Sequence, residues 1–224
     1  MSIKENLLNI QSQLPERVTL VAVSKTKPVS DLMEAYEAGQ RIFGENKIQE
    51  MTEKWQQMPK DIQWHMIGHV QTNKVKFMAE YVSLIHGVDS LKLLEEINKQ
   101  AKKHNRVIDC LLQIYIAEEE SKFGLDEAEL DEILDFVQND KNAMKNIRIV
   151  GLMGMATFTD NQNQIKKEFQ NLKAIFDTLR DIRLKSDAIQ VNTLSMGMSG
   201  DYQLAIECGS TMVRIGSSIF GGRK

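Results

Sequence analysis

Two groups of residues capable of chemistry lie near opposite ends of the chain. The apolar run Thr19-Leu-Val-Ala-Val-Ser-Lys25 places a lysine amine at its carboxyl edge. Two later runs, Leu194-Ser-Met-Gly-Met-Ser-Gly200 and Thr211-Met-Val-Arg-Ile-Gly-Ser-Ser-Ile-Phe-Gly221, finish in small residues. Their hydroxyl and backbone N–H groups are the donors that surround a bound phosphate. A lysine combined with a phosphate site predicts binding of a phosphorylated aldehyde, held as a Schiff base.

Pyridoxal 5′-phosphate is the first candidate for that aldehyde. At the end of an apolar run, partial desolvation of Lys25 favours the neutral amine that attacks a carbonyl. The predicted phosphate donors follow the two late runs: Ser195, Ser199, Gly200, Gly216, Ser217 and Ser218. The alternatives are a rim lysine whose stem covers apolar neighbours and two glycine–serine turns that bind nothing.

Arg214 lies inside the last apolar run, between two aliphatic residues. A buried guanidinium is costly without an acceptor, so it is expected to meet either a ligand or a carboxylate. A pyridine ring nitrogen would serve, and because arginine only donates, that nitrogen would stay unprotonated and the ring would be a weak electron sink. Glu207 and Glu45 are the candidate carboxylates for the alternative, a buried ion pair.

Three more candidates lie at predicted strand ends. Asn46 is expected to hydrogen-bond the phenolic oxygen of the cofactor, His69 to lie on or beside its ring, and Met198 to lie under the ring. The alternatives are a helix N-cap, a rim histidine and core filling. His65 and His86 fall within strands and are predicted to be core residues. No metal site is expected, because the four histidines share no ligand spacing with cysteines or carboxylates.

Short apolar runs alternate with helical patterns along the whole chain. The predicted strands are Val18–Ser24, Arg41–Gly44, Ile62–Ile67, Leu84–Val88, Asp109–Ile116, Ile147–Met155, Thr193–Met196 and Val213–Ile215. The predicted helices are Ile3–Gln13, Val29–Ala38, Lys47–Gln57, Asn73–Tyr81, a run after Ser90, Asp126–Gln138, a run from Ile165 to Leu179, and Tyr202–Glu207. The alternation favours one α/β domain over residues 1–224, a single (β/α)8 TIM barrel with an extra N-terminal helix. An open doubly wound sheet is the alternative.

Composition bounds the function. The 224 residues carry a net charge of −3 with both signs mixed, which gives no indication of nucleic-acid binding. No apolar run reaches the roughly 18 residues that a membrane span needs. Cys110 and Cys208 are isolated, so they are expected to be reduced and the protein is expected to be cytoplasmic. A monomer is expected because no surplus amphipathic helix requires a partner.

Seven motifs in order resemble the pyridoxal phosphate homeostasis protein family, from about residue 18 to the C-terminus. They are Val21-Ala-Val-Ser-Lys-Thr-Lys-Pro28, Phe43-Gly-Glu-Asn46, Trp64-His-Met-Ile-Gly-His-Val-Gln-Thr-Asn-Lys74, Glu119-Glu-Ser-Lys-Phe-Gly124, Gly151-Leu-Met-Gly-Met-Ala156, Leu194-Ser-Met-Gly-Met-Ser199 and Arg214-Ile-Gly-Ser-Ser-Ile-Phe-Gly221. The resemblance implies a barrel similar to the N-terminal domain of alanine racemase, with the cofactor on Lys25. It also implies that Arg214 faces the pyridine nitrogen and that Ser199, Gly216 and Ser217 contact the phosphate. One departure is Tyr115, where the family usually has asparagine.

The expected function is therefore binding of pyridoxal 5′-phosphate on Lys25 for intracellular homeostasis, with transfer to apoenzymes and Lys122 as a second amine. The alternative is a weak racemase or lyase that uses Tyr115 or a partner's residue. A third possibility is a barrel that binds another phosphorylated metabolite, with Lys25 serving only as a charge. Racemisation needs acid–base groups on both faces of the imine, and no second domain is expected to supply one, so we expect no enzyme activity.

Overall fold

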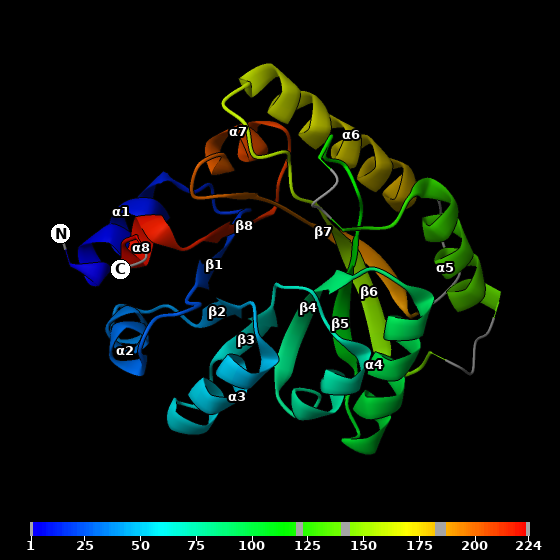
Figure 1. Ribbon diagram of the computed structural model, residues 1–224, viewed down its shortest axis with the longest axis horizontal. Coiled ribbons are helices and arrows are strands. Elements are labelled where there is room, and N and C mark those ends of the chain that lie inside the picture. Colours follow the sequence, from blue (N-terminus) through cyan, green and yellow to red (C-terminus); the bar gives the residue numbers. More distant parts are fainter. Residues whose placement is uncertain (1, 120–122, 140–143, 182–186, 223–224) are drawn as a thin grey trace.

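The computed structural model describes residues 2–119, 123–139, 144–181 and 187–222, and these form a closed barrel of eight parallel strands (Figure 1). The strands are β1 Thr19–Val23, β2 Ile42–Glu45, β3 Gln63–Met66, β4 Val82–Val88, β5 Ile108–Gln113, β6 Ile147–Met153, β7 Ile189–Met198 and β8 Met212–Ile215. Each strand pairs with its neighbour in sequence order, and β8 pairs with β1 to close the sheet. The predicted barrel is confirmed.

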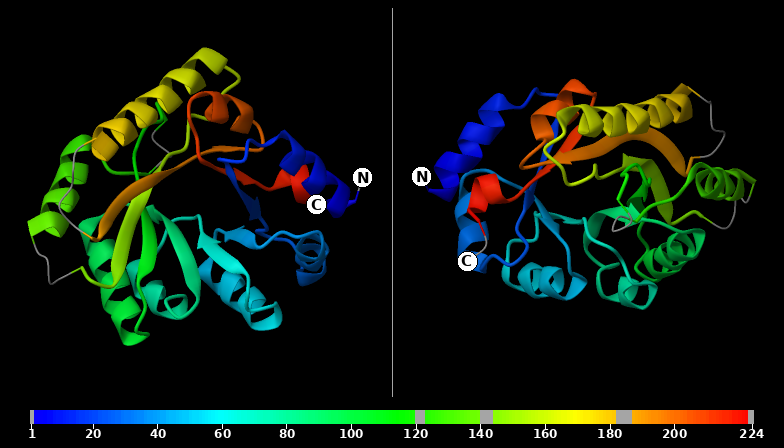
Figure 2. Two further views of the ribbon diagram at one scale, coloured as in Figure 1. Left: turned by 180° about the vertical axis from the view of Figure 1, so that it is seen from behind. Right: turned by 45° about the horizontal axis from the view of Figure 1, so that its top comes forward.

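Helices surround the barrel on its outer face (Figure 2). In the described residues they are α1 Ile3–Gln13, α2 Val29–Glu37, α3 Ile48–Gln57, the 3₁₀-helix η1 Thr72–Phe77, α4 Leu91–Lys103, α5 Glu127–Asn139, α6 Gln162–Asp181, α7 Tyr202–Glu207 and α8 Ser217–Phe220. The extra N-terminal helix is confirmed: Ser2 caps α1 by accepting the Glu5 N–H, and the Glu5 carboxylate accepts the Ser2 N–H. None of the described helices has the length and apolar character needed to cross a membrane.

Three elements differ most from the sequence-based prediction, and several strand ends also differ, notably that of β5, which ends at Gln113 rather than at Ile116. The α-helix expected over Asn73–Tyr81 is the shorter 3₁₀-helix η1, in which the three-residue spacing of Val75 and Met78 buries both side chains on one side. Strand β7 extends beyond Thr193–Met196 at both ends, and near its carboxyl end its register against β8 shifts where Gly197 adopts a positive φ of 95°. Helix α8 was not predicted, since four residues are too few to show a helical period.

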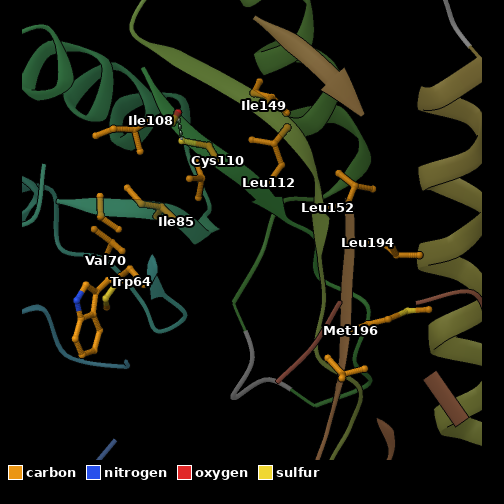
Figure 3. Close-up of a cluster of buried hydrophobic side chains, with 14 of the residues drawn as sticks. Trp64, Val70, Ile85, Ile108, Cys110, Leu112, Ile149, Leu152, Leu194 and Met196 are labelled. Atoms are coloured by element: carbon orange, nitrogen blue, oxygen red, sulfur yellow. Dashed lines mark hydrogen bonds between the residues drawn. The ribbon is translucent and has the colours of Figure 1, made fainter. Parts of the chain in front are cut away.

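Alternation along the strands separates an outer core from the barrel interior. Leu20 and Ala22 of β1 belong to the large cluster between sheet and helices, whereas Val21 belongs to a smaller, separate cluster with Leu111 and Met212. Figure 3 shows part of the large cluster, with Leu194 and Met196 of β7 directed toward α6. Inward-facing residues at the carboxyl ends of the strands therefore have their side chains at the mouth of the barrel.

The two chain ends meet beside the barrel. Helices α1 and α8 lie side by side, and the Asn6 side chain donates to the Ile219 carbonyl at 3.1 Å. Lys27 adds a second connection, because its Nζ donates to the carbonyls of Phe220 at 2.9 Å and Gly222 at 3.1 Å. Contacts of these two kinds fix α8 next to the loop that follows β1.

Candidate cofactor pocket

A pocket of about 660 Å³ opens at the carboxyl ends of the strands. Eight of the residues predicted to bind the cofactor line it: Lys25, Asn46, His69, Met198, Ser199, Arg214, Gly216 and Ser217. They come from the ends of β1, β2, β3, β7 and β8, which are far apart in sequence. This is where (β/α)8 barrels place their functional groups.

Lys25 lies in a turn two residues beyond β1 rather than on the strand itself. Val21 and Val23, four and two positions earlier, have side chains that face the barrel interior. Lys25 continues this every-second-residue pattern, and its side chain faces the mouth of the barrel. The next residue, Thr26, has a φ of +64°, a left-handed conformation that is unfavourable for a β-branched residue. Lys25 therefore lies in a turn whose unfavourable backbone conformation must be stabilised by contacts with neighbouring residues.

A buried ionic network under this turn supplies the restraint. Lys54 of α3 donates to the Ser24 carbonyl at 2.8 Å and to the carboxylates of Glu45 and Glu50, both at 2.7 Å. The same Glu50 oxygen accepts the Thr26 N–H at 2.6 Å. One buried ammonium thus ties both sides of the Lys25 turn to α3 and β2.

The proposed phosphate end is formed by the loops after β7 and β8. The Gly216 N–H donates to the Ser199 hydroxyl at 3.2 Å, which joins the two loops into one surface. A Cβ on Gly216 would lie 2.9 Å from the Val23 carbonyl oxygen, so only glycine fits between β8 and β1. The Ser199 and Ser217 hydroxyls and the first N–H groups of α8 make a donor set suited to an anion.

Three predicted donors lie outside this surface. Gly200 and Ser218 do not line the pocket. Ser195 is fully buried inside the barrel, where its hydroxyl contacts Arg214 and His86. Ser195 was expected at the phosphate, but its side chain points into the barrel interior, one layer below the mouth.

Arg214 lines the pocket although it is only 4% exposed. It donates to the Ser195 carbonyl at 3.0 Å, the Ser195 hydroxyl at 2.6 Å and the Gly154 carbonyl at 3.2 Å. The suggested carboxylate partners, Glu207 and Glu45, are not its partners, because Glu45 pairs instead with Lys54. Burial lowers the pKa of Arg214 to about 10, and nearby Asp201 opposes this shift, so the guanidinium stays charged at neutral pH.

The remaining candidates surround the ring position. His69 Nδ1 lies 3.1 Å from an Asp89 oxygen, and its ring stacks on Phe123 at a centroid distance of 5.4 Å. The helix-cap alternative for Asn46 does not hold, since the N-cap of α3 is Lys47. Gln113, whose amide donates to the Phe123 carbonyl at 2.6 Å, also lines the pocket and was missed. Its inward position at the end of β5 could have indicated it.

Tyr115 does not join the pocket. Its hydroxyl donates to the Glu119 carbonyl at 2.8 Å, and the residue is not part of the lining. Tyr115, the residue that a weak racemase or lyase was expected to use, is therefore not placed at the pocket, because β5 already ends at Gln113. Lys122, the suggested second amine, lies outside the described residues.

Comparison with known proteins identifies the family of the chain. The family model for the alanine racemase N-terminal domain matches residues 1–224. A pyridoxal phosphate homeostasis protein from Vibrio alginolyticus is 40% identical, over 99% of this chain and 98% of that protein. The chain belongs to the pyridoxal phosphate homeostasis protein family.

Solved structures agree with this assignment. PipY of Synechococcus elongatus PCC7942 is 34% identical, and the match covers 98% of this chain and 100% of PipY. The TM-score is 0.90 for PipY without PLP and 0.87 for PipY with PLP bound. This chain and PipY therefore share the barrel, and PipY has been solved both without and with PLP bound.

Proposed function

We propose that this chain binds pyridoxal 5′-phosphate in the pocket at the barrel mouth, as a Schiff base on Lys25, and serves intracellular homeostasis of the cofactor. The observation that carries the proposal is that Lys25 lines the same pocket as Arg214 and the donors after β7 and β8. The PLP-bound structure of PipY, which is 34% identical, supports the choice of ligand.

The donor set fits the cofactor group by group. Ser199, Gly216 and Ser217 would hold the phosphate, and Arg214 would donate to the pyridine nitrogen. Asn46 would hydrogen-bond the phenolic oxygen. His69 and Met198 would lie beside the ring. When bound, the aldehyde supplies an electrophilic carbon that condenses reversibly with an amine.

Two features favour holding and supplying the cofactor over catalysis. Arg214 remains charged and can only donate, so a ring nitrogen facing it stays unprotonated and withdraws electrons weakly. The relatives are named as homeostasis proteins. We further propose that the protein acts as a cytoplasmic monomer and passes the cofactor to pyridoxal phosphate-dependent apoenzymes.

Borohydride trapping tests the proposal directly. The protein is mixed with pyridoxal 5′-phosphate, reduced and digested, and the pyridoxyl adduct is mapped to a peptide by mass spectrometry. We expect the adduct on Lys25, its loss in Lys25→Arg, and its retention in Lys27→Arg. Lys27 is the matched control because it lines the same pocket while its amine already donates to two carbonyls.

Three results would overturn the proposal. An adduct on Lys27, or none, would show that Lys25 does not carry the cofactor. Full affinity for the cofactor in Lys25→Ala would show that binding depends on neither a covalent bond to this lysine nor its charge. Turnover of an amino acid that continues for many cycles per protein molecule would replace the homeostasis role with an enzymatic one.

A further inference from the structure

Four polar side chains form a hydrogen-bonded row across the interior of the barrel. His65 Nδ1 lies 3.1 Å from His86 Nε2, and His86 Nδ1 lies 3.1 Å from the Ser195 hydroxyl. Arg214 completes the row by donating to that hydroxyl at 2.6 Å. The residues come from β3, β4, β7 and β8, and none is more than 4% exposed.

The row connects two cavities at opposite ends of the barrel. Arg214 lines the cofactor pocket at the carboxyl ends of the strands. His65 lines a second cavity of about 410 Å³, together with the ion pair of Arg148 and Asp109 near the amino ends of β5 and β6. No part of the proposed cofactor site uses the two histidines, so their position calls for an explanation.

The hydrogen bonds in the row are all donated in the same direction, from Arg214 toward His65. Arginine has no acceptor, so the Ser195 oxygen accepts from Arg214. The Ser195 hydrogen then goes to His86 Nδ1, because among the described residues this hydroxyl, which is fully buried, has no other acceptor. His86 must therefore carry its hydrogen on Nε2 and donate to His65 Nδ1, which leaves the hydrogen of His65 on Nε2.

We propose that His86 and His65 are positioning residues that hold Arg214 in one orientation through the Ser195 hydroxyl. The inference rests on the proposed function insofar as Arg214 is assigned to the ring nitrogen. The two neutral histidines orient the serine hydroxyl, and the hydroxyl orients the guanidinium. Burial lowers the pKa of both histidines, which is consistent with neutral rings.

The surroundings of Arg214 explain why such a row is needed. Among the described residues, no carboxylate lies within ion-pair distance of the guanidinium, and its three hydrogen bonds go to uncharged oxygen atoms. Three of its five N–H groups are used in this way. A buried arginine without a carboxylate partner depends on such fixed acceptors for its geometry, and its remaining donors are left for a ligand in the pocket.

The tautomers give a test that needs no cofactor. Selective ¹⁵N labelling of the four histidines, with His65→Gln and His86→Asn used for assignment, separates the two buried rings in long-range ¹H–¹⁵N spectra. We expect both rings to be neutral with the hydrogen on Nε2 at pH 7. A hydrogen on Nδ1 of His86, or a charged ring, would overturn the proposal.

Ligand affinity gives the second test. The probe is pyridoxamine 5′-phosphate, which has the ring nitrogen and phosphate but no aldehyde to react with Lys25. We expect His86→Leu to weaken its binding about tenfold, the effect of losing one oriented hydrogen bond to a charged group. Binding of inorganic phosphate should stay within a factor of two, because that ligand does not reach Arg214 in the proposed arrangement.

Conservative replacements separate positioning from general damage. His86→Asn keeps an acceptor near the place of Nδ1 and is expected to restore most of the lost affinity. Ser195→Ala removes only the hydroxyl and should reproduce the tenfold loss even if His86→Leu folds poorly. Wild-type affinity in Ser195→Ala would contradict the proposal. By contrast, a wild-type protein that binds neither probe would remove the proposed function but leave the tautomer result standing.

Discussion

At the scale of single residues, Lys54 is the least expected feature of the molecule. Sequence patterning alone places it on a helix, where a lysine is normally exposed, yet its side chain is 6% exposed and contacts two carboxylates. Burial raises the pKa of Glu45, and the Lys54 ammonium opposes that shift. The ammonium therefore compensates a charge that would otherwise be isolated beneath the Lys25 turn.

Replacing this lysine is expected to be strongly destabilising. Lys54→Met leaves the Glu45 carboxylate buried without its cation and releases the Ser24 carbonyl, so we expect a loss of about 3–5 kcal/mol in the free energy of unfolding. Urea denaturation measures it. The control is Lys99→Met, which breaks a pair whose lysine is 66% exposed and should cost less than about 1 kcal/mol. Equal losses in the two variants would contradict this role for Lys54.

At the scale of elements, the loops after β2 and β3 approach each other backbone to backbone. A Cβ on Gly68 would lie 2.5 Å from the Asn46 carbonyl oxygen and 2.9 Å from its Cα. Both residues line the pocket, so the contact that demands glycine also sets the position of Asn46. The two loops behave as one unit of the site.

Gly68→Ala is therefore expected to affect stability and binding together. Overlap with backbone atoms cannot be relieved by a rotamer change, so we expect a loss of about 1–3 kcal/mol in unfolding free energy. Affinity for pyridoxal 5′-phosphate should fall severalfold, which a fluorescence titration measures. Gly200→Ala is the matched control, because no atom lies within 4 Å of the added carbon. If both variants resemble the wild type, the close approach is not rigid.

At the scale of the whole molecule, the barrel interior is polar in its middle layer. His65, His86, Ser195 and Arg214 cross the barrel interior at the level of the apolar interior cluster, between the cofactor pocket and the cavity at the amino ends of the strands. Neither histidine can gain a proton in the folded barrel without placing a further charge beside the guanidinium. Both rings are buried in the folded barrel, and unfolding exposes them fully to water.

This interior predicts a loss of stability in mild acid. Burial lowers the pKa of His65 to about 3, whereas in the unfolded chain it is about 6.5, so only the unfolded state binds a proton between these values. Stability is fully present above pH 6.5 and falls as the pH drops. Between pH 6.5 and 4.5, His65 alone should account for about 2–3 kcal/mol.

Urea denaturation at several pH values tests this. The His65→Gln variant should lose about 2–3 kcal/mol less than the wild type over the same interval, whatever its stability at pH 7. Identical pH dependence in the two proteins would mean that His65 titrates in the folded state.

Much of the fold and pocket is encoded in local patterns. The eight apolar runs, the capping residues Ser2 and Ser90, and the spacing along α6 each depend on neighbours a few residues away. The eight predicted ligand-binding residues line one pocket because a parallel barrel brings all strand ends to one mouth. Their roles toward a ligand stay predictions.

Only the tertiary structure determined which side chains contact each other inside the barrel. The partners of Arg214, the burial of Ser195, the network around Lys54 and the exclusion of Tyr115 all join or separate strands distant in sequence. Strand register and parity determine these contacts, and a shift of one residue sends a side chain to the other face of the sheet. The amino-acid sequence thus predicted that Lys25 and the serine and glycine residues after β7 and β8 meet at one mouth, while only barrel closure selected the residues that hold them in place.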